Sequence, residues 1–188
     1  YETRLYDHTQ NKSVYEFAKI VDNRTIVFEK GKNKRNQSAV WIDIFPLDGA
    51  PETEAETKKV FKKIHNLRNM LDLAVTNPFV NPQSFIKKLL KSAVRLFLIR
   101  LGQKFFCKKI NKIAKSFSYE NSKFVSVMVW QLNDHDKMPS EVLKEEIDVI
   151  FEGYKFKAPK KYDEYLKSLY GDYMKLPPES ERIPHGFT

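Results

Sequence analysis

Apolar residues recur at helical spacing after residue 53 and predict a long helix there. Intervals of four, three, four and three residues, the period of one helical face, separate Val60, Ile64, Leu67, Leu71 and Ala74. Thr53-x-x-Glu56 precedes this run and matches a capping box, in which two side chains bond free amides of the first turn. We therefore expect the helix to start near Thr53 and to end at or before Asn77-Pro78.

Short β-branched and aromatic segments elsewhere in the chain predict strands. The expected strands are residues 14–20, 24–29, 39–45 and 124–130, followed by a hairpin of 149–151 and 154–156. The expected turns are the turn-prone pairs Asp22-Asn23, after the first strand, and Glu152-Gly153, in the hairpin. The further expected helices are 84–100 and 103–115, broken near Gly102, a short one at 139–146, and one from Pro159 to about Tyr170.

This order of helices and strands indicates an α+β protein. We expect a small, mainly antiparallel or mixed sheet covered by four or five helices. A chain of 188 residues fits one domain and can bury a core, and no repeat or linker divides it. The prediction is a single domain over residues 1–188.

The composition predicts a globular core and excludes both an internal disulfide and a zinc finger. Hydrophobic residues make up 41% of the chain, which is typical of a folded domain. A single cysteine, Cys107, excludes an internal disulfide and any zinc-finger spacing. Such cysteine usage suits a reducing compartment, so we expect a cytoplasmic protein.

The net charge of +9 comes from one segment. Between Leu73 and Tyr119 there is no Asp or Glu, and the basic residues there are Lys87, Lys88, Lys91, Arg95, Arg100, Lys104, Lys108, Lys109, Lys112 and Lys115. This basic helical segment, residues 83–117, is either an amphipathic surface that contacts an anionic membrane or a solvated helical hairpin that covers the sheet. No uncharged run reaches the ~18 residues of a bilayer span. Nucleic-acid binding ranks low because no recognition motif is present.

One acidic residue, Asp43, interrupts the apolar strand 41–45. Because side chains alternate along a strand, Asp43 should share a face with Trp41 and Phe45, while Ile42 and Ile44 point the other way. An unpaired buried charge is heavily penalised, so Asp43 must either pair with a side chain or bind a cation. Mg²⁺, which prefers oxygen ligands, is the cation that such a carboxylate would suit.

Three other polar side chains are candidates for binding phosphate. Lys19 lies in a predicted strand, and Arg182 and His185 lie in the C-terminal coil. Cationic groups hold a diphosphate and stabilise its charge during transfer, while a histidine can act as a base near neutral pH. The alternatives are an exposed, snorkelling Lys19 and a structural His185. Asp134-His135-Asp136 is interpreted as a solvated loop rather than a metal site.

Two separated motifs resemble a known family. They are Trp41–Pro51 and Tyr170–Glu179, the latter followed by Arg182 and His185, with shorter matching pieces at 17–20, 151–153 and 158–163. These segments resemble the LicD family, phosphocholine transferase-like members of the nucleotidyltransferase superfamily. The resemblance spans almost the whole chain, although residues 77–128 carry no family motif.

The resemblance implies both a fold and an activity. The fold would be the later portion of a nucleotidyltransferase-like fold. The activity would be Mg²⁺-dependent transfer of a group such as phosphocholine from a nucleotide-activated donor such as CDP-choline. Its acceptor would be a cell-surface glycan, such as lipopolysaccharide, or teichoic acid. Asp43 would be a catalytic carboxylate and metal ligand, and Lys19, Arg182 and His185 would bind substrate. A membrane-linked acceptor would suit a location at the inner face of the membrane.

The sequence departs from the family at one place. Members carry an N-terminal Gly-Thr turn and an Asp-rich strand that supply two further metal carboxylates, and no such block stands in these 188 residues. We expect the chain to begin just after that block and to be inactive alone. The alternative is a non-catalytic remnant, or glycan-binding scaffold, of the same fold.

Overall fold

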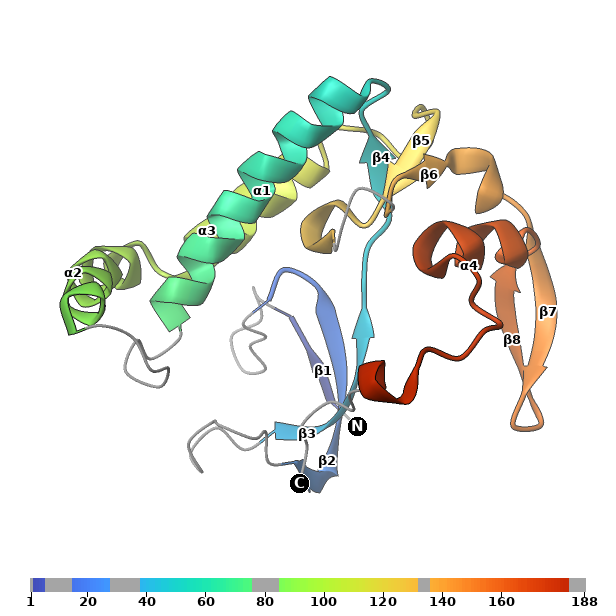
Figure 1. The fold of residues 1–188 in the computed structure, drawn as a ribbon, viewed down its shortest axis with the longest axis horizontal. Helices are drawn as coiled ribbons and strands as arrows, with labels where there is room; N and C mark the ends of the chain where they lie inside the picture. The colour runs from blue at the N-terminus through green and yellow to red at the C-terminus, as the bar shows by residue number, and fades with distance from the viewer. Residues whose placement is uncertain (1, 6–14, 28–37, 76–84, 132–135, 183–188) are drawn as a thin grey trace. The chain divides into compact units, whose positions relative to one another are not determined.

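The computed structural model describes residues 2–5, 15–27, 38–75, 85–131 and 136–182 (Figure 1). Within these ranges the chain forms four α-helices and eight short strands, which confirms the α+β prediction. The expected single sheet is wrong, because the strands form three separate sheets in which every pairing is antiparallel. A nucleotidyltransferase-like fold stays a prediction.

The described residues group into two compact units. Unit 1 contains the described parts of Tyr1–Phe45 and Lys62–Ile113, and unit 2 contains those of Pro46–Phe61 and Ala114–Arg182. Unit 1 contains one of the three sheets and unit 2 the other two, and each unit has its own apolar cluster. A single domain over residues 1–188 stays a prediction.

The sheet of unit 1 consists of β1 (Glu2–Arg4), β2 (Ala18–Val27) and β3 (Ser38–Ile44), in the order β1-β2-β3. The predicted turn at Asp22-Asn23 is wrong, because β2 runs through this pair without a break. The polar side chains of the pair bond neighbours instead of forming a turn. Asp22 accepts hydrogen bonds from Arg24, and Asn23 donates one to Glu2 on β1. The β2–β3 register does shift between Asp22 and Val27, so the pair marks an irregularity in the ladder.

The helices of the chain follow the predicted periodicity. They are α1 (Glu54–Val75), α2 (Phe85–Leu101) and α3 (Gln103–Ala114), with α4 (Tyr162–Tyr170) near the C-terminal end. Gly102 separates α2 from α3 with a φ of 79°, a left-handed conformation that glycine adopts without a steric penalty. In unit 1 the three helices meet in an apolar cluster of Leu71, Ala74, Leu98, Phe106 and Cys107.

Unit 2 contains the other two sheets (Figure 1). Their strands are β4 (Asp48–Ala50), β5 (Phe124–Ser126) and β6 (Met138–Pro139), in the order β4-β5-β6, and the hairpin of β7 (Glu146–Phe151) and β8 (Tyr154–Pro159). The hairpin turn at Glu152-Gly153 is confirmed, since both residues have positive φ, as a two-residue turn of type I′ requires. The cluster of Val125, Met138 and Val142 forms the core of this unit.

Three predicted elements of unit 2 are shorter than expected. The predicted strand 124–130 ends at Ser126 and is followed by a 3₁₀ turn, Met128–Trp130. The predicted helix 139–146 is a single 3₁₀ turn, Ser140–Val142, after which β7 begins. Pro159 ends β8 rather than opening α4. In the last two cases strand pairing takes residues that local propensity assigned to a helix.

Candidate functional site

Asp43 and Lys19 face each other across two neighbouring strands of unit 1. Asp43 on β3 is the direct partner of Lys19 on β2, and Lys19 Nζ lies 2.7 Å from Asp43 Oδ1. The alternation along β3 is as predicted, because Ile42 and Ile44 are exposed on the other face. Asp43 was expected either to pair with a side chain or to bind a cation, and in the structure it pairs with Lys19.

Aromatic rings surround this ion pair. Lys19 Nζ lies 4.5 Å from the ring centroid of Trp41 and 5.3 Å from those of Tyr15 and Phe17. The side chains of Lys19 and Asp43 retain 17% and 30% exposure, so the interpretation of Lys19 as an exposed, snorkelling lysine is wrong. A cation over aromatic faces is stabilised by about 0.5–2 kcal/mol, more as it loses water. We call these five residues the aromatic pair site.

The shared face of Trp41, Asp43 and Phe45 was predicted, whereas the matching run that ends at Lys19 was missed. Tyr15, Phe17 and Lys19 alternate at a spacing of two, as do Trp41, Asp43 and Phe45. Two such runs on adjacent strands place aromatic and charged side chains on one face of a sheet. The stacked rings of Tyr15 and Phe17, 5.3 Å apart, and the Phe17–Phe45 contact at 4.4 Å follow from it.

A second, buried ion pair lies next to this segment in the sequence. Glu16 Oε1 is 3.8 Å from Arg68 Nε on α1, and the Glu16 side chain is fully buried. Burial raises the pKa of Glu16 to about 7, because the charged form loses its hydration. Burial also raises the pKa of Asp72, one turn further along α1. Sequence reasoning missed this group, since nothing in the spacing of Glu16 distinguishes it from a surface residue.

The described residues do not form a magnesium site on their own. Among them there is no group of three or more His, Cys, Asp or Glu side chains placed to hold a metal ion. Asp43 is the single carboxylate of the aromatic pair site, and its contact there is an ammonium group. A role for Asp43 as a metal ligand stays a prediction.

The remaining candidates lie in unit 2 or outside the described residues. Arg182 belongs to unit 2, where its exposed side chain donates from Nε to the carbonyl oxygen of Pro177 over 2.7 Å. His185 lies outside the described residues, as do Asp134 and His135. Their predicted roles therefore stay predictions.

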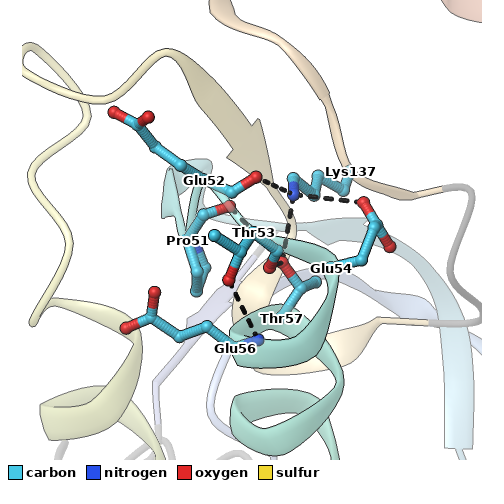
Figure 2. A network of polar contacts seen from close by, with 7 residues as sticks. All are labelled: Pro51, Glu52, Thr53, Glu54, Glu56, Thr57 and Lys137. Atoms are coloured by element: carbon cyan, nitrogen blue, oxygen red, sulfur yellow. Dashed lines mark hydrogen bonds and ion pairs between the residues drawn. The ribbon is translucent and has the colours of Figure 1, made fainter.

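Lys137 of unit 2, which the sequence did not single out, holds the start of α1 (Figure 2). Its ammonium donates to the Glu52 carbonyl oxygen over 3.0 Å and to Thr57 Oγ1 over 3.1 Å, and pairs with Glu54 over 3.3 Å. These oxygens offset the unfavourable approach of a cation to the positive end of a helix dipole. These contacts tie β6 and the residue before it to the start of α1 within unit 2.

The predicted capping box is present on one side of the same network (Figure 2). Thr53 Oγ1 accepts a hydrogen bond from the Glu56 amide over 3.3 Å. The Thr53 carbonyl oxygen accepts a bond from the Thr57 hydroxyl over 2.8 Å. The motif therefore fixes the start of α1 as the sequence predicted.

No helix in the described ranges is both long enough and apolar enough to cross a bilayer.

Comparison with known proteins identifies a relative over most of the chain. No family model matches the sequence, and no solved structure matches it. The chain is 29% identical to the lipopolysaccharide cholinephosphotransferase LicD of Haemophilus influenzae over 172 residues, which make up 90% of this chain and 62% of that protein. The chain thus spans about three-fifths of the length of this relative. Similarity over nine-tenths of the chain supports the resemblance to the LicD family that the two motifs predicted.

Proposed function

We propose that this protein transfers phosphocholine, or a closely related group, from a nucleotide-activated donor such as CDP-choline to a cell-surface glycan such as lipopolysaccharide. The observation that carries the proposal is the Lys19–Asp43 pair enclosed by aromatic rings, in a chain similar to LicD. The site offers one positive group, one negative group and an aromatic wall in one place.

Phosphocholine is chemically complementary to these three features. Its trimethylammonium group carries a positive charge without an N–H donor, and such groups bind over aromatic faces. Its phosphate suits a lysine ammonium as a point charge. Phosphocholine would therefore replace the Lys19–Asp43 pair with two new pairs, phosphate with Lys19 and trimethylammonium with Asp43 over Trp41. Arg182 and His185 remain proposed ligands of the donor's further phosphate.

A magnesium ion with Asp43 as one ligand also stays part of the proposal. Because the described residues contain no cluster of metal ligands, its other ligands would lie outside them. A direct check is to titrate Mn²⁺ as a probe into the chain and to compare wild type with Asp43→Asn by electron paramagnetic resonance. Equal binding by the two proteins would remove Asp43 from the list of ligands.

Transferase activity is tested with the protein purified together with any sequence that flanks these residues in its gene. The assay measures CMP release from CDP-choline and the incorporation of labelled choline into lipopolysaccharide. We expect Asp43→Asn to lower the rate about 100-fold, because the trimethylammonium group loses its carboxylate partner and the donor is misplaced for transfer. Asp148→Asn is the matched control, since Asp148 on β7 also pairs with lysines, at 2.9 and 2.8 Å, but is outside the aromatic pair site. An unchanged rate in Asp43→Asn, or no transfer by wild type, contradicts the proposal.

A non-catalytic scaffold of the same fold is the second candidate. It is favoured by the ion pair of Asp43, which leaves the carboxylate engaged by Lys19, and by the lack of a metal cluster in the described part of the chain. Saturable phosphocholine binding without CMP release would favour the scaffold, whereas CMP release that depends on Asp43 would favour the enzyme.

Contact with an anionic membrane at its inner face belongs to the same proposal. An enzyme that modifies a membrane-linked glycan must reach an acceptor at that surface. The basic helical segment supplies positive charge for such a contact, and each Lys or Arg near an anionic surface contributes about 1 kcal/mol.

A further inference from the structure

The helix α2 exposes most of its large apolar side chains. Seven large apolar side chains are exposed among its described residues: Leu89, Leu90, Val94, Leu96, Phe97, Ile99 and Leu101. Leu98 is buried, in the cluster that also contains Leu71 of α1 and Phe106 of α3. Among the described side chains of α2, residues 89–101, Leu98 is the one buried in that cluster. The exposed apolar surface beside it needs an explanation, since contiguous apolar patches mark interaction sites.

The exposed side chains form an ordered face rather than a scatter. Leu90, Val94, Phe97 and Leu101 follow one another at intervals of four, three and four residues, which places them on one stripe. Leu89, Ala93 and Leu96 follow at four and three residues and widen the stripe on one side. We call these seven residues the α2 apolar face. Lys91 and Arg95 share a different stripe with the buried Leu98, whereas the exposed Arg100 follows Leu96 by four residues and lies at the C-terminal end of the apolar face. A long arginine side chain at such an edge can extend to head groups while its stem stays on apolar surface.

The charge around this face favours one kind of occupant. No acidic residue occurs between Leu73 and Tyr119, and exposed lysines continue on α3 at Lys104, Lys108, Lys109 and Lys112. A second copy of the chain would bring these positive charges against one another. An anionic lipid surface accepts both properties, because lysines pair with head groups while apolar side chains enter the boundary of the acyl region.

We propose that α2 lies flat in the interface of an anionic membrane, with the α2 apolar face inserted and the lysines of α2 and α3 on the head groups. This assignment rests on the proposed membrane contact and names the surface that makes it. It does not depend on transferase activity, because the apolar face and the charge are properties of α2 and α3 alone.

The first experiment measures co-sedimentation of the full chain with vesicles. We use phosphatidylcholine vesicles with and without phosphatidylglycerol, at low and high salt. The wild type should bind the vesicles that contain phosphatidylglycerol, and binding should fall at high salt, where charges are screened. The proposal is overturned if the chain binds no vesicles, or if its binding changes neither with phosphatidylglycerol content nor with salt concentration.

A pair of matched double variants separates apolar insertion from charge. Leu96→Gln/Phe97→Gln removes side chains with 71% and 64% exposure from the α2 apolar face, and Ile150→Gln/Phe151→Gln removes side chains with 69% and 66% exposure from β7 of unit 2. The first variant should lower vesicle affinity about tenfold or more, because two inserted side chains are lost. The second should bind like wild type. Equal effects of the two variants overturn the proposal, and circular dichroism checks that both are folded.

Insertion has a direct spectroscopic readout. Leu96→Trp should be quenched by brominated acyl chains in phosphatidylglycerol vesicles, whereas Ile150→Trp should not. Absence of quenching at position 96, together with a Leu96/Phe97-dependent dimer in sedimentation velocity, would assign the face to a second copy and overturn the proposal. A failure of CMP release in the transferase assay leaves these vesicle measurements unaffected, so the two proposals fail separately.

Discussion

The side chains around Lys19 come from two neighbouring segments, and the ion pair with its aromatic contacts forms only when these segments pair. Lys19 and Asp43 are direct cross-strand partners, and Trp41 and Phe17 belong to the two segments that hold them. An ammonium in this position keeps a half-buried carboxylate compensated, which avoids the penalty of an unpaired charge. The same geometry is what a zwitterionic head group would use.

Binding of phosphocholine should depend on the indole of Trp41. We expect Trp41→Leu to weaken phosphocholine binding by the chain about tenfold, which corresponds to the loss of one desolvated cation–π contact. Isothermal titration calorimetry measures the affinity. Phe105→Leu is the control, since the Phe105 ring also lies under a lysine, with Lys109 Nζ 5.3 Å from its centroid. Equal affinities in wild type and Trp41→Leu would exclude the aromatic pair site as the head-group site.

The buried Glu16 predicts a pH-dependent stability. Its pKa rises from 4.5 in the unfolded chain to about 7 in the fold, so its contribution to stability is full below pH 4.5 and is lost as the pH rises to about 7. The loss is about 3 kcal/mol at most. The pKa of about 7 already includes the lowering effect of Arg68 and the raising effect of Asp72. Glu16→Gln carries no titrating group there. The difference in unfolding free energy, wild type minus Glu16→Gln, should therefore fall between pH 4.5 and 7 in urea denaturation. A difference that is constant over this range contradicts the prediction.

Helices with a long apolar periodicity form where the sequence predicts them. Predictions are wrong where pairing with a neighbouring strand overrides a local preference. The ends of α1, α2 and α3 agree with the predicted helices, and Gly102 breaks the chain as expected. The pair Asp22-Asn23 has a strong local preference for a turn. It lies inside β2, where residues 19–21 pair with β1 on one side and β3 on the other, and β3 also pairs with Asp22. That pairing depends on residues about 20 positions away, which a local pattern does not contain.

The close packing of β4 gives a test of this element. A Cβ atom on Gly49 would lie 2.5 Å from the Ser118 carbonyl oxygen and 2.9 Å from that of Phe117. We expect Gly49→Ala to destabilise the protein by about 3 kcal/mol, because backbone atoms must move. Gly102→Ala is the comparison, since Gly102 has open space around it but a positive φ, and should cost about 1 kcal/mol. Chemical denaturation measures both, and equal losses would contradict the role of close packing at Gly49.

The architecture as a whole consists of two units that share α1, which starts in unit 2 and continues in unit 1. The LicD-like motif Trp41–Pro51 likewise runs from the end of β3 in unit 1 to β4 and Pro51 in unit 2. Positive charge belongs mainly to α2 and α3 of unit 1. The expected membrane surface and the aromatic pair site therefore both lie in unit 1.

The sequence alone was sufficient for α1, α2 and α3, the hairpin turn, the α+β class, the face of β3 that holds Asp43, and the LicD resemblance. Each of these depends on local periodicity, on turn chemistry or on motifs contiguous in the chain. Three features required the folded chain: the pairing of Asp43 with Lys19, the burial of Glu16 against Arg68, and the exposure of the α2 apolar face. The physical reason is common to them, because each depends on which side chains far apart in sequence meet, or fail to meet, after the strands and helices have packed.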